Sequence, residues 1–288
     1  MKPFKYMFRA EKLILMISCV IVSLTACQTT SVDSRLKTAT QISNSAKFVF
    51  ADVDGKDFVL RVYYRFLNST KPLRVYIEGD GQAWTSRSRK SDNPTPINPL
   101  ALRLAAMDNS ENVIYVGRPC QFVDIGLNPK CRSDYWTSHR FAPEVINSVM
   151  NVIDAAQKVS KTHDIELFGF SGGAAVAVLV ASNRKDVSSI RTIAGNLDHV
   201  LLNRKKKVSQ LTGSLNPVDV AVKVSGIPQI HFFGSNDDVI GESIANSYRD
   251  SSGRKDCIVI ERVRGASHLS GWVENWQELL KIPMPNCI

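Results

Sequence analysis

Several features that would assign a chain to another class of protein are missing from this sequence. Its 288 residues contain no internal repeat and no low-complexity block that would divide them into smaller units. The most apolar segment, residues 13–22, is too short for a comfortable membrane span. No histidine or second cysteine stands at ligand spacing near a cysteine, so we expect no metal and no cofactor. The formal charge of +9 is spread along the chain, and nothing indicates a nucleic-acid-binding fold.

The first residues have the composition of an export signal. Residues 2–12 are basic, residues 13–22 are apolar, and residues 24–27 (Leu-Thr-Ala-Cys) resemble a bacterial lipobox. We predict a lipoprotein signal peptide over residues 1–26, with Cys27 lipidated as the mature N-terminus. An ordinary signal peptide or an uncleaved anchor is the alternative. Gln28 is not an aspartate, which favours the outer membrane of a bacterial envelope, facing the periplasm.

A polar segment follows the lipidation site. Residues 28–46 are rich in serine and threonine and lack aromatic side chains. Such a composition buries too little apolar surface to offset the entropy of ordering. We therefore predict that residues 27–46 are the lipidated cysteine and a flexible tether, and that residues 47–288 are the folded domain.

The rest of the chain alternates between strand and helix patterns. Apolar, β-branched and aromatic runs predict strands at residues 47–53, 58–66, 73–78, 112–116, 164–168, 189–195, 229–234 and 257–263. Helical spacing predicts helices at residues 99–107, 143–161, 174–182 and 272–281. Two strands that look antiparallel, followed by β/α alternation, indicate an α/β fold. We expect a mostly parallel central sheet of about eight strands with helices on both faces.

One serine stands on a sharp turn between a predicted strand and a predicted helix. The segment 169–173 reads Gly-Phe-Ser-Gly-Gly, with Ser171 at its centre. Such a turn exposes the serine hydroxyl, and the small flanking residues allow the backbone to turn tightly. The N–H groups that open the following helix face the place where an oxyanion would develop. Ser171 is therefore a candidate nucleophile of a serine hydrolase.

Two later loops supply a base and an acid. His268 follows the last predicted strand, and Asp237 follows the strand that ends at Gly234. The carboxyl ends of parallel strands meet at one edge of the sheet, so these side chains should approach Ser171. The order Ser, Asp, His along the chain fits a nucleophile on such a turn. Asp238 and Asp198 are alternative acids, and Asp237 could instead cap a helix.

Residues 47–288 resemble the α/β-hydrolase fold superfamily. Within them, residues 77–84, 118–122 and 194–199 look like segments of a group of poorly characterised bacterial lipoprotein hydrolases. The resemblance implies that Ser171 is the nucleophile, His268 the base and Asp237 the acid, since Asp237 stands three residues after the glycine that ends its strand.

The oxyanion donors are less conventional. The superfamily usually has His-Gly after the third strand, where this chain has Glu78-Gly79. We predict that the backbone N–H groups of Asp80 and Gly172 form the oxyanion hole.

Four cysteines remain after Cys19, in the signal, and Cys27 are set aside. An even number in an exported protein predicts two disulfides, with three possible pairings. One loop holds both Cys120 and Cys131. Cys257 opens the last strand, and the final helix should bring Cys287 back to the start of that strand. We therefore predict the pairs Cys120–Cys131 and Cys257–Cys287, because other pairings would connect opposite edges of the sheet.

These observations predict a membrane-tethered serine esterase or acyl hydrolase that works through an acyl-enzyme on a small-molecule or lipid ester. The same triad could serve a peptidase, an amidase or a thioesterase. A third alternative is a catalytically silent envelope lipoprotein that binds a glycan, a lipid or a partner. The long loop 117–142, Trp84 and Trp136 should shape the pocket. The basic loop residues Arg87, Arg89 and Lys90 favour either an anionic substrate or simple solvation.

The remaining histidines have weaker claims to a site. His139, His163 and His231 are expected to be structural, because they lie in the long loop, at the wrong edge or within a strand. His199 lies near the correct edge and is expected to pack or to line the pocket.

Overall fold

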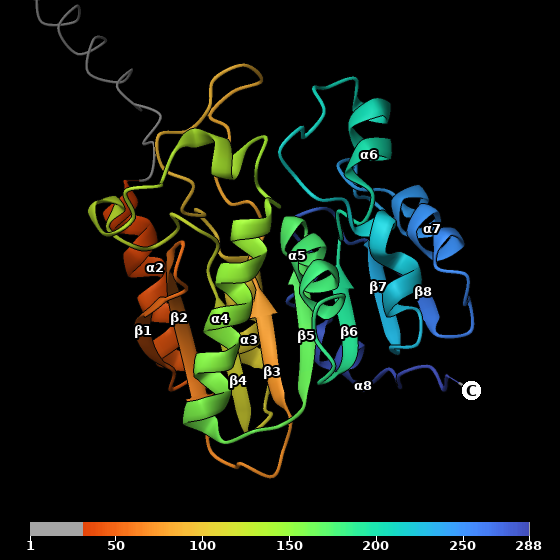
Figure 1. Ribbon diagram of the computed structural model, residues 1–288, viewed down its shortest axis with the longest axis horizontal. Helices are drawn as coiled ribbons and strands as arrows, with labels where there is room; N and C mark the ends of the chain where they lie inside the picture. The colour runs from red at the N-terminus through yellow and green to blue at the C-terminus, as the bar shows by residue number, and fades with distance from the viewer. Residues whose placement is uncertain (1–30, 288) are drawn as a thin grey trace, which may run out of the picture. The chain divides into compact units, whose positions relative to one another are not determined.

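The computed structural model describes residues 31–287 and contains a central eight-stranded sheet (Figure 1). The strands, in the order in which they occur along the chain, are β1 (Val49–Asp54), β2 (Val59–Phe66), β3 (Leu73–Ile77), β4 (Asn112–Val116), β5 (Ile165–Phe170), β6 (Val187–Ile193), β7 (Gln229–Gly234) and β8 (Ile258–Val263). Their order across the sheet is β1-β2-β4-β3-β5-β6-β7-β8. The pairs β1/β2 and β2/β4 are antiparallel, and every other neighbouring pair is parallel. The predicted mostly parallel sheet is confirmed.

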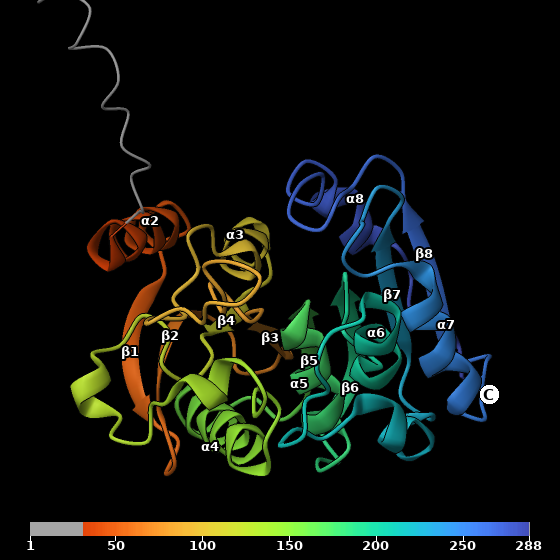
Figure 2. The same ribbon diagram turned by 90° about the horizontal axis from the view of Figure 1, so that it is seen from above.

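Helices cover both faces of this sheet (Figure 2). The α-helices are α2 (Val32–Ser45), α3 (Leu100–Met107), α4 (Pro143–Ser160), α5 (Gly172–Ala181), α6 (His199–Lys206), α7 (Glu242–Ser251) and α8 (Trp276–Lys281). Short 3-10 helices are η1 (Ile125–Leu127), η2 (Ser133–Trp136) and η3 (Pro217–Val224). One face carries α4, α5 and α7, and the other carries α2, α3 and α8.

Strand alternation assigns buried side chains to these two layers. Along β3, Val75 and Ile77 belong to the core beneath α4 and α5, whereas Tyr76 belongs to the core beneath α8. Tyr76 stacks on Phe168 of β5 with ring centroids 4.4 Å apart, and both rings meet Trp276 edge to face. Strands that are buried on both faces read as near-continuous apolar runs, which is why the sequence predicts them well.

The predicted flexible tether is wrong for most of its length, because residues 32–45 form α2. Ala39 and Ile42 are buried against α3, and Arg35 donates a hydrogen bond from Nη1 to the Thr95 carbonyl at 2.8 Å. Leu36, Ala39 and Ile42 recur at three-residue intervals and form a narrow apolar stripe. The many serines and threonines around the stripe conceal it in the overall composition. The packed part of the chain therefore begins near residue 32 rather than at residue 47.

Both predicted disulfides are present. Cys120–Cys131 closes part of the loop after β4, with Cα atoms 5.8 Å apart. Cys257–Cys287 joins the residue before β8 to the end of the chain, with Cα atoms 4.9 Å apart. The final helix is shorter than predicted, because α8 begins at Trp276.

The predictions about residues 1–26, Cys27 and Gln28 lie outside the described residues. Among residues 31–287, no helix is both long and apolar enough to cross a bilayer.

Candidate active site

Ser171 stands on the turn between β5 and α5. Its backbone has φ of +50° and ψ of −114°, a strained conformation that holds a nucleophilic side chain outward at such turns. The Ser171 N–H donates to the Ile193 carbonyl of β6 at 2.9 Å, which fixes the turn to its neighbouring strand. Close packing explains the glycines, since a Cβ on Gly173 would lie 2.2 Å from the Ile77 carbonyl oxygen. The turn therefore presents the serine hydroxyl at the carboxyl edge of the sheet.

Three side chains meet at this edge in one chain of hydrogen bonds. His268 Nε2 lies 3.1 Å from Ser171 Oγ. His268 Nδ1 lies 2.9 Å from Asp237 Oδ2. The residues are far apart in sequence, but β5, β7 and β8 run parallel and end at the same edge. The predicted Ser-His-Asp arrangement is thus assembled at hydrogen-bonding distance.

The carboxylate of Asp237 uses its two oxygens separately. Oδ2 faces His268, whereas Oδ1 accepts hydrogen bonds from the N–H groups of Val239 at 2.8 Å and Ile240 at 2.9 Å. The sequence left a helix cap and a histidine partner as alternatives for Asp237. This side chain faces His268, and its hydrogen bonds from Val239 and Ile240 close a loop turn rather than cap a helix, because α7 begins at Glu242. Burial raises the pKa of Asp237, but the hydrogen bonds from His268 and the Ile240 N–H outweigh burial and lower it. The group is therefore ionised at neutral pH.

The loop after β8 holds His268 in place. Trp272 is fully buried, and its Nε1 donates to the Ser267 carbonyl at 2.8 Å and to the His268 carbonyl at 3.2 Å. Phe170 packs on the imidazole with ring centroids 5.4 Å apart. The imidazole is 16% exposed, so solvent reaches the ring although its backbone is anchored.

In the described part of the chain, neither alternative acid contacts His268. Asp238 is exposed. Asp198 caps α6 by accepting from the Leu201 N–H at 3.0 Å, and its other oxygen accepts from the Ser247 hydroxyl at 2.7 Å. The geometry therefore favours Asp237 over both.

The other histidines make contacts away from Ser171. His231 is buried in β7 beside the Thr192 hydroxyl at 2.8 Å, and burial lowers its pKa to about 3, which keeps it neutral. His139 lies 2.9 Å from the Ser138 hydroxyl, and His163 is exposed before β5. His199 is buried against the ring of Phe141.

A buried network fixes the segment that follows β3. Glu78 is 1% exposed and accepts hydrogen bonds from the Gly79 N–H at 2.9 Å and the Tyr115 hydroxyl at 3.1 Å. Gln121 donates from Nε2 to the Gly79 carbonyl at 3.1 Å. Burial raises the pKa of Glu78 to about 7 in spite of these hydrogen bonds. The network holds Asp80 at the same edge as Ser171.

The two predicted oxyanion donors belong to residues that lie close together. Gly172 opens α5, so its N–H has no acceptor inside the helix. No acceptor for the Asp80 N–H occurs in residues 31–287. A Cβ on Gly172 would lie 2.1 Å from Asp80 Oδ1, which shows how closely Asp80 approaches the residue after Ser171.

Sequence reasoning missed two arginines next to these donors. The Asp80 carboxylate forms ion pairs with Arg118 at 3.4 Å and Arg140 at 2.6 Å. Arg118 begins the segment 118–122, which carried part of the family resemblance, so a signal for it was present. Arg140 lies in the long loop with no motif around it.

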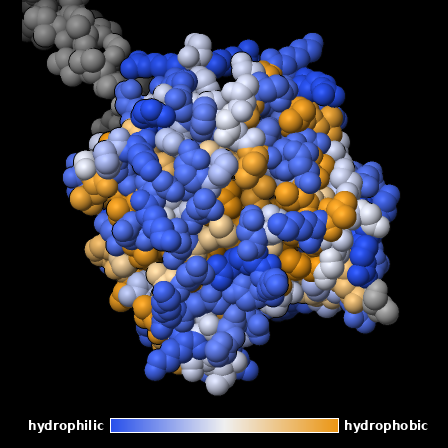
Figure 3. Space-filling view, viewed as in Figure 1, coloured by the Kyte–Doolittle hydropathy of each residue, from blue (hydrophilic) through white to orange (hydrophobic). Residues whose placement is uncertain are grey.

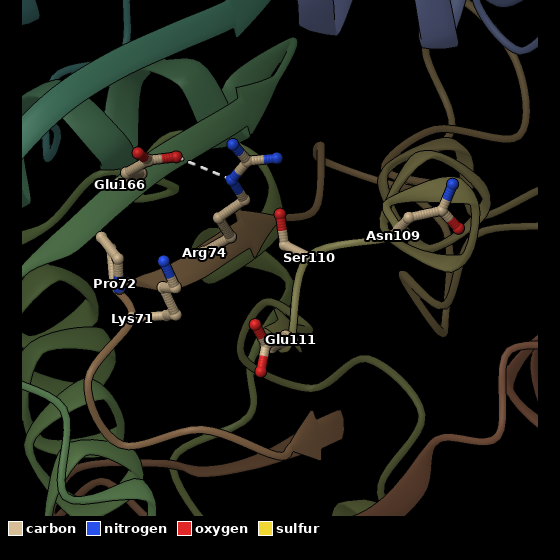
Figure 4. A pocket seen from close by; sticks show the side chains of 7 residues that line it. All are labelled: Lys71, Pro72, Arg74, Asn109, Ser110, Glu111 and Glu166. Atoms are coloured by element: carbon tan, nitrogen blue, oxygen red, sulfur yellow. Dashed lines mark hydrogen bonds and ion pairs between the residues drawn. The ribbon is translucent and has the colours of Figure 1, made fainter.

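Two shallow cavities lie outside the triad. One of about 380 Å³ is lined by Ser235, Arg262 and Arg264, at the ends of β7 and β8. The other, of about 250 Å³, lies at the opposite edge of the sheet and includes Arg74 and Glu166 (Figure 4).

Hydrophilic residues predominate along the upper margin in Figure 3, where the loops at the carboxyl edge lie. Within residues 31–287, no group of His, Cys, Asp and Glu side chains could hold a metal ion.

Comparisons with known proteins identify the fold. A scan against family models and a search of curated proteins gave no match. Among solved structures, Est1E from Butyrivibrio proteoclasticus is similar, with a TM-score of 0.54 and 14% identity over 81% of this chain and 96% of that chain. A putative α/β hydrolase from Agrobacterium tumefaciens has a TM-score of 0.54 and 16% identity over 83% and 99% of the two chains.

A longer protein shares the same domain. Pyrococcus horikoshii acylaminoacyl peptidase gives a TM-score of 0.58 and 12% identity, and the match covers 80% of this chain but 38% of the peptidase. With the sheet order described above, these similarities show that the chain has the α/β-hydrolase fold.

Proposed function

We propose that the protein is a serine hydrolase that cleaves esters through an acyl-enzyme, with Ser171, His268 and Asp237 as its catalytic triad. The observation that carries the proposal is the continuous hydrogen-bonded chain from Asp237 Oδ2 through the imidazole to Ser171 Oγ. A serine hydroxyl is a weak nucleophile until a neighbouring base can take its proton. The strained turn at Ser171 supports the same role, because backbone strain of this kind is found at functional sites.

The geometry supports a two-step acyl transfer. Ser171 Oγ attacks the substrate carbonyl carbon while His268 Nε2 accepts the hydroxyl proton. Asp237 holds the imidazole with Nδ1–H directed at its carboxylate and stabilises the imidazolium. The imidazolium then gives its proton to the leaving alcohol, and the acyl group stays on Ser171. A water molecule, deprotonated by His268, releases the acid and restores the hydroxyl.

The N–H groups of Asp80 and Gly172 are proposed to bind the oxyanion. Support comes from the close approach of Asp80 to Gly172 and from the lack of a competing acceptor for either N–H group within residues 31–287. In comparable sites each such donor contributes about 3 kcal/mol to transition-state binding.

Hydrolysis of 4-nitrophenyl butyrate by the purified domain tests the proposal. Wild-type protein should release nitrophenolate, and Ser171→Ala should lower kcat by about 10⁶-fold, to the background of the folded protein. Circular dichroism would establish that the variant is folded. Equal turnover by both proteins would contradict the proposal.

A peptidase or amidase is the second candidate function. The observation that favours it is the similarity to acylaminoacyl peptidase and to a puromycin hydrolase, which has a TM-score of 0.55 and 13% identity over 80% of this chain. An acyl-4-nitroanilide with the same acyl group separates the two functions. Turnover of the anilide close to that of the ester favours the amidase, whereas an ester-only enzyme leaves the anilide intact. A folded protein that turns over neither substrate and whose Ser171 does not react with a fluorophosphonate would favour the third alternative, a catalytically silent binding lipoprotein.

We further propose that a lipid on Cys27 tethers the enzyme to the bacterial outer membrane, facing the periplasm. Support comes from the sequence of residues 1–28 alone. Mass spectrometry of the N-terminal peptide from membrane fractions should find Cys27 acylated, and Cys27→Ala should move the protein to the soluble fraction. An unmodified Cys27 in membrane-bound protein would contradict the tether.

A further inference from the structure

Two guanidinium groups surround one carboxylate beside the nucleophile. Asp80 Oδ1 lies 3.4 Å from Arg118 Nη1, and Asp80 Oδ2 lies 2.6 Å from Arg140 Nη1. The arginines are connected as well, because Arg118 donates from Nη2 to the Arg140 carbonyl. Arg140 is held by a hydrogen bond from Nε to the Thr137 carbonyl at 2.7 Å. The three charged groups form a fixed cluster, which we call the Asp80 cluster.

The Asp80 cluster is next to the reacting atoms. Asp80 Oδ1 occupies the space over Gly172, the residue that follows Ser171 and supplies one proposed oxyanion donor. The Asp80 carboxylate therefore contacts both guanidinium groups and also lies against the backbone next to Ser171.

The Asp80 cluster has a surplus positive charge. Arg118 is 4% exposed, and its Nε has no hydrogen-bond partner in the described part of the chain. Glu78 attracts Arg118 electrostatically but forms no ion pair with it, since it accepts hydrogen bonds from Gly79 and Tyr115. No second carboxylate among residues 31–287 pairs with either arginine. A buried charge is costly without a partner, so the site has a strong reason to take up a second anion.

Solvent and ligands can reach the Arg140 side of the Asp80 cluster. The side chains of Asp80 and Arg140 are 15% and 16% exposed, so the outer part of the Asp80 cluster is accessible. Arg87 and Arg89, in the exposed loop after β3, add further positive charge at the same edge of the sheet. A negatively charged substrate would be attracted to such an edge.

We propose that Arg140, with the buried Arg118 behind it, binds a carboxylate of the substrate, so that the enzyme prefers substrates with a carboxylate a few bonds from the scissile carbonyl. Guanidinium groups bind carboxylates in paired, planar geometry, which suits a fixed arginine pair. In the free enzyme the Asp80 carboxylate occupies this place, and the substrate carboxylate joins or displaces it. This inference rests on the proposed function of Ser171, because it names the substrate class of that site.

Matched substrates test the proposal and locate the anion. One arm compares mono-4-nitrophenyl glutarate, with a carboxylate on the acyl side, with 4-nitrophenyl butyrate. A second arm compares 3-butyryloxybenzoate with phenyl butyrate, which places the carboxylate on the leaving group. Ser171→Ala protein supplies the background rate for each ester. Wild-type kcat/KM should be at least tenfold higher for the charged ester in one of the two arms, which identifies the side that the arginines contact.

Three variants separate recognition from general electrostatics. Arg140→Gln should lower the charged-to-neutral ratio of kcat/KM by at least tenfold, and Asp80→Asn, which keeps the backbone N–H, should raise it. Arg264→Gln removes an equal charge from an exposed position at the same edge and should change the ratio less than twofold.

The outcomes distinguish this proposal from the proposed function. Two results would overturn the carboxylate proposal even if ester hydrolysis is intact. One is a charged-to-neutral ratio of kcat/KM that stays within twofold of wild type in Arg140→Gln. The other is a preference for the neutral ester in both arms. A folded protein that hydrolyses none of the four esters in a Ser171-dependent manner would overturn the proposed function first.

Discussion

Two clusters of arginine and carboxylate side chains lie at opposite edges of the sheet, and they differ in the number of arginines per carboxylate. At the amino edge, Arg74 binds two carboxylates, Asp108 at 3.0 Å and Glu166 at 2.7 Å. Figure 4 shows the pair with Glu166. Asp108 also accepts from the Tyr76 hydroxyl at 2.6 Å. At the carboxyl edge, two arginines share the single carboxylate of Asp80.

This difference indicates that the two edges of the sheet have different roles. In the amino-edge cluster two carboxylates share the single arginine Arg74, and the network ties β3 to β5 and to the end of α3. The Asp80 cluster has one cation too many and a buried nitrogen without a partner. Two carboxylates that share a largely buried arginine contribute to stability, whereas an excess of arginine next to a strained serine is suited to binding an anion. Substitutions at the two edges should therefore affect different properties.

The largest expected effect comes from Asp237→Asn at the carboxyl edge. Asparagine keeps an oxygen for the N–H groups of Val239 and Ile240, but it places an amide NH₂ against His268 and so favours the wrong tautomer. We expect kcat on 4-nitrophenyl butyrate to fall by about 10⁴-fold. Steady-state kinetics measure this fall, and Asp238→Asn is the control, with a change below twofold. A larger loss from Asp238→Asn would reassign the acid.

Asp108→Ala at the amino edge should lower the stability of the fold and leave the activity nearly unchanged. It leaves a largely buried Arg74 with one carboxylate and the Tyr76 hydroxyl without an acceptor. The free energy of unfolding should fall by about 3 kcal/mol. Urea denaturation measures this loss, and kcat should remain within twofold of wild type. Arg140→Gln is the matched change at the carboxyl edge and should lower the unfolding free energy by less than about 1 kcal/mol, because it removes surplus charge.

The smallest effect concerns Glu78, which lies beneath the proposed oxyanion segment. Burial raises its folded-state pKa to about 7 from an ordinary value of 4.5. Its contribution to stability is therefore complete below pH 4.5 and is lost as the pH rises through 7. Between pH 5 and pH 8 the wild type should lose about 2 kcal/mol relative to Glu78→Gln. Urea unfolding at both pH values measures the difference, and parallel pH curves for the two proteins would contradict it.

The sheet and the triad could be predicted from sequence because each depends on local signals. Residues 165–170 are an apolar strand, residues 169–173 have turn chemistry, and the parallel topology then brings the loops of Asp237 and His268 to Ser171. The choice between Asp237 and Asp238 needed coordinates, since both follow the same strand. What decides it is which carboxylate turns toward the imidazole.

The remaining features depend on contacts that the sequence does not encode locally. The helix at residues 32–45 was missed because its buried stripe is narrow and its polar residues dominate the average composition. Arg140 reaches Asp80 across 60 residues through a loop without regular periodicity. Neither periodicity nor a motif could predict that contact, although Arg118 stood within a recognisable segment.

The central claim is that Ser171 is an activated nucleophile. Incubation of the folded protein with a fluorophosphonate, followed by peptide mass spectrometry, tests it most directly. The account predicts one adduct, on Ser171 Oγ, whose formation slows sharply in His268→Ala. No adduct on the folded wild-type protein, or one on another serine at an equal rate, would contradict it.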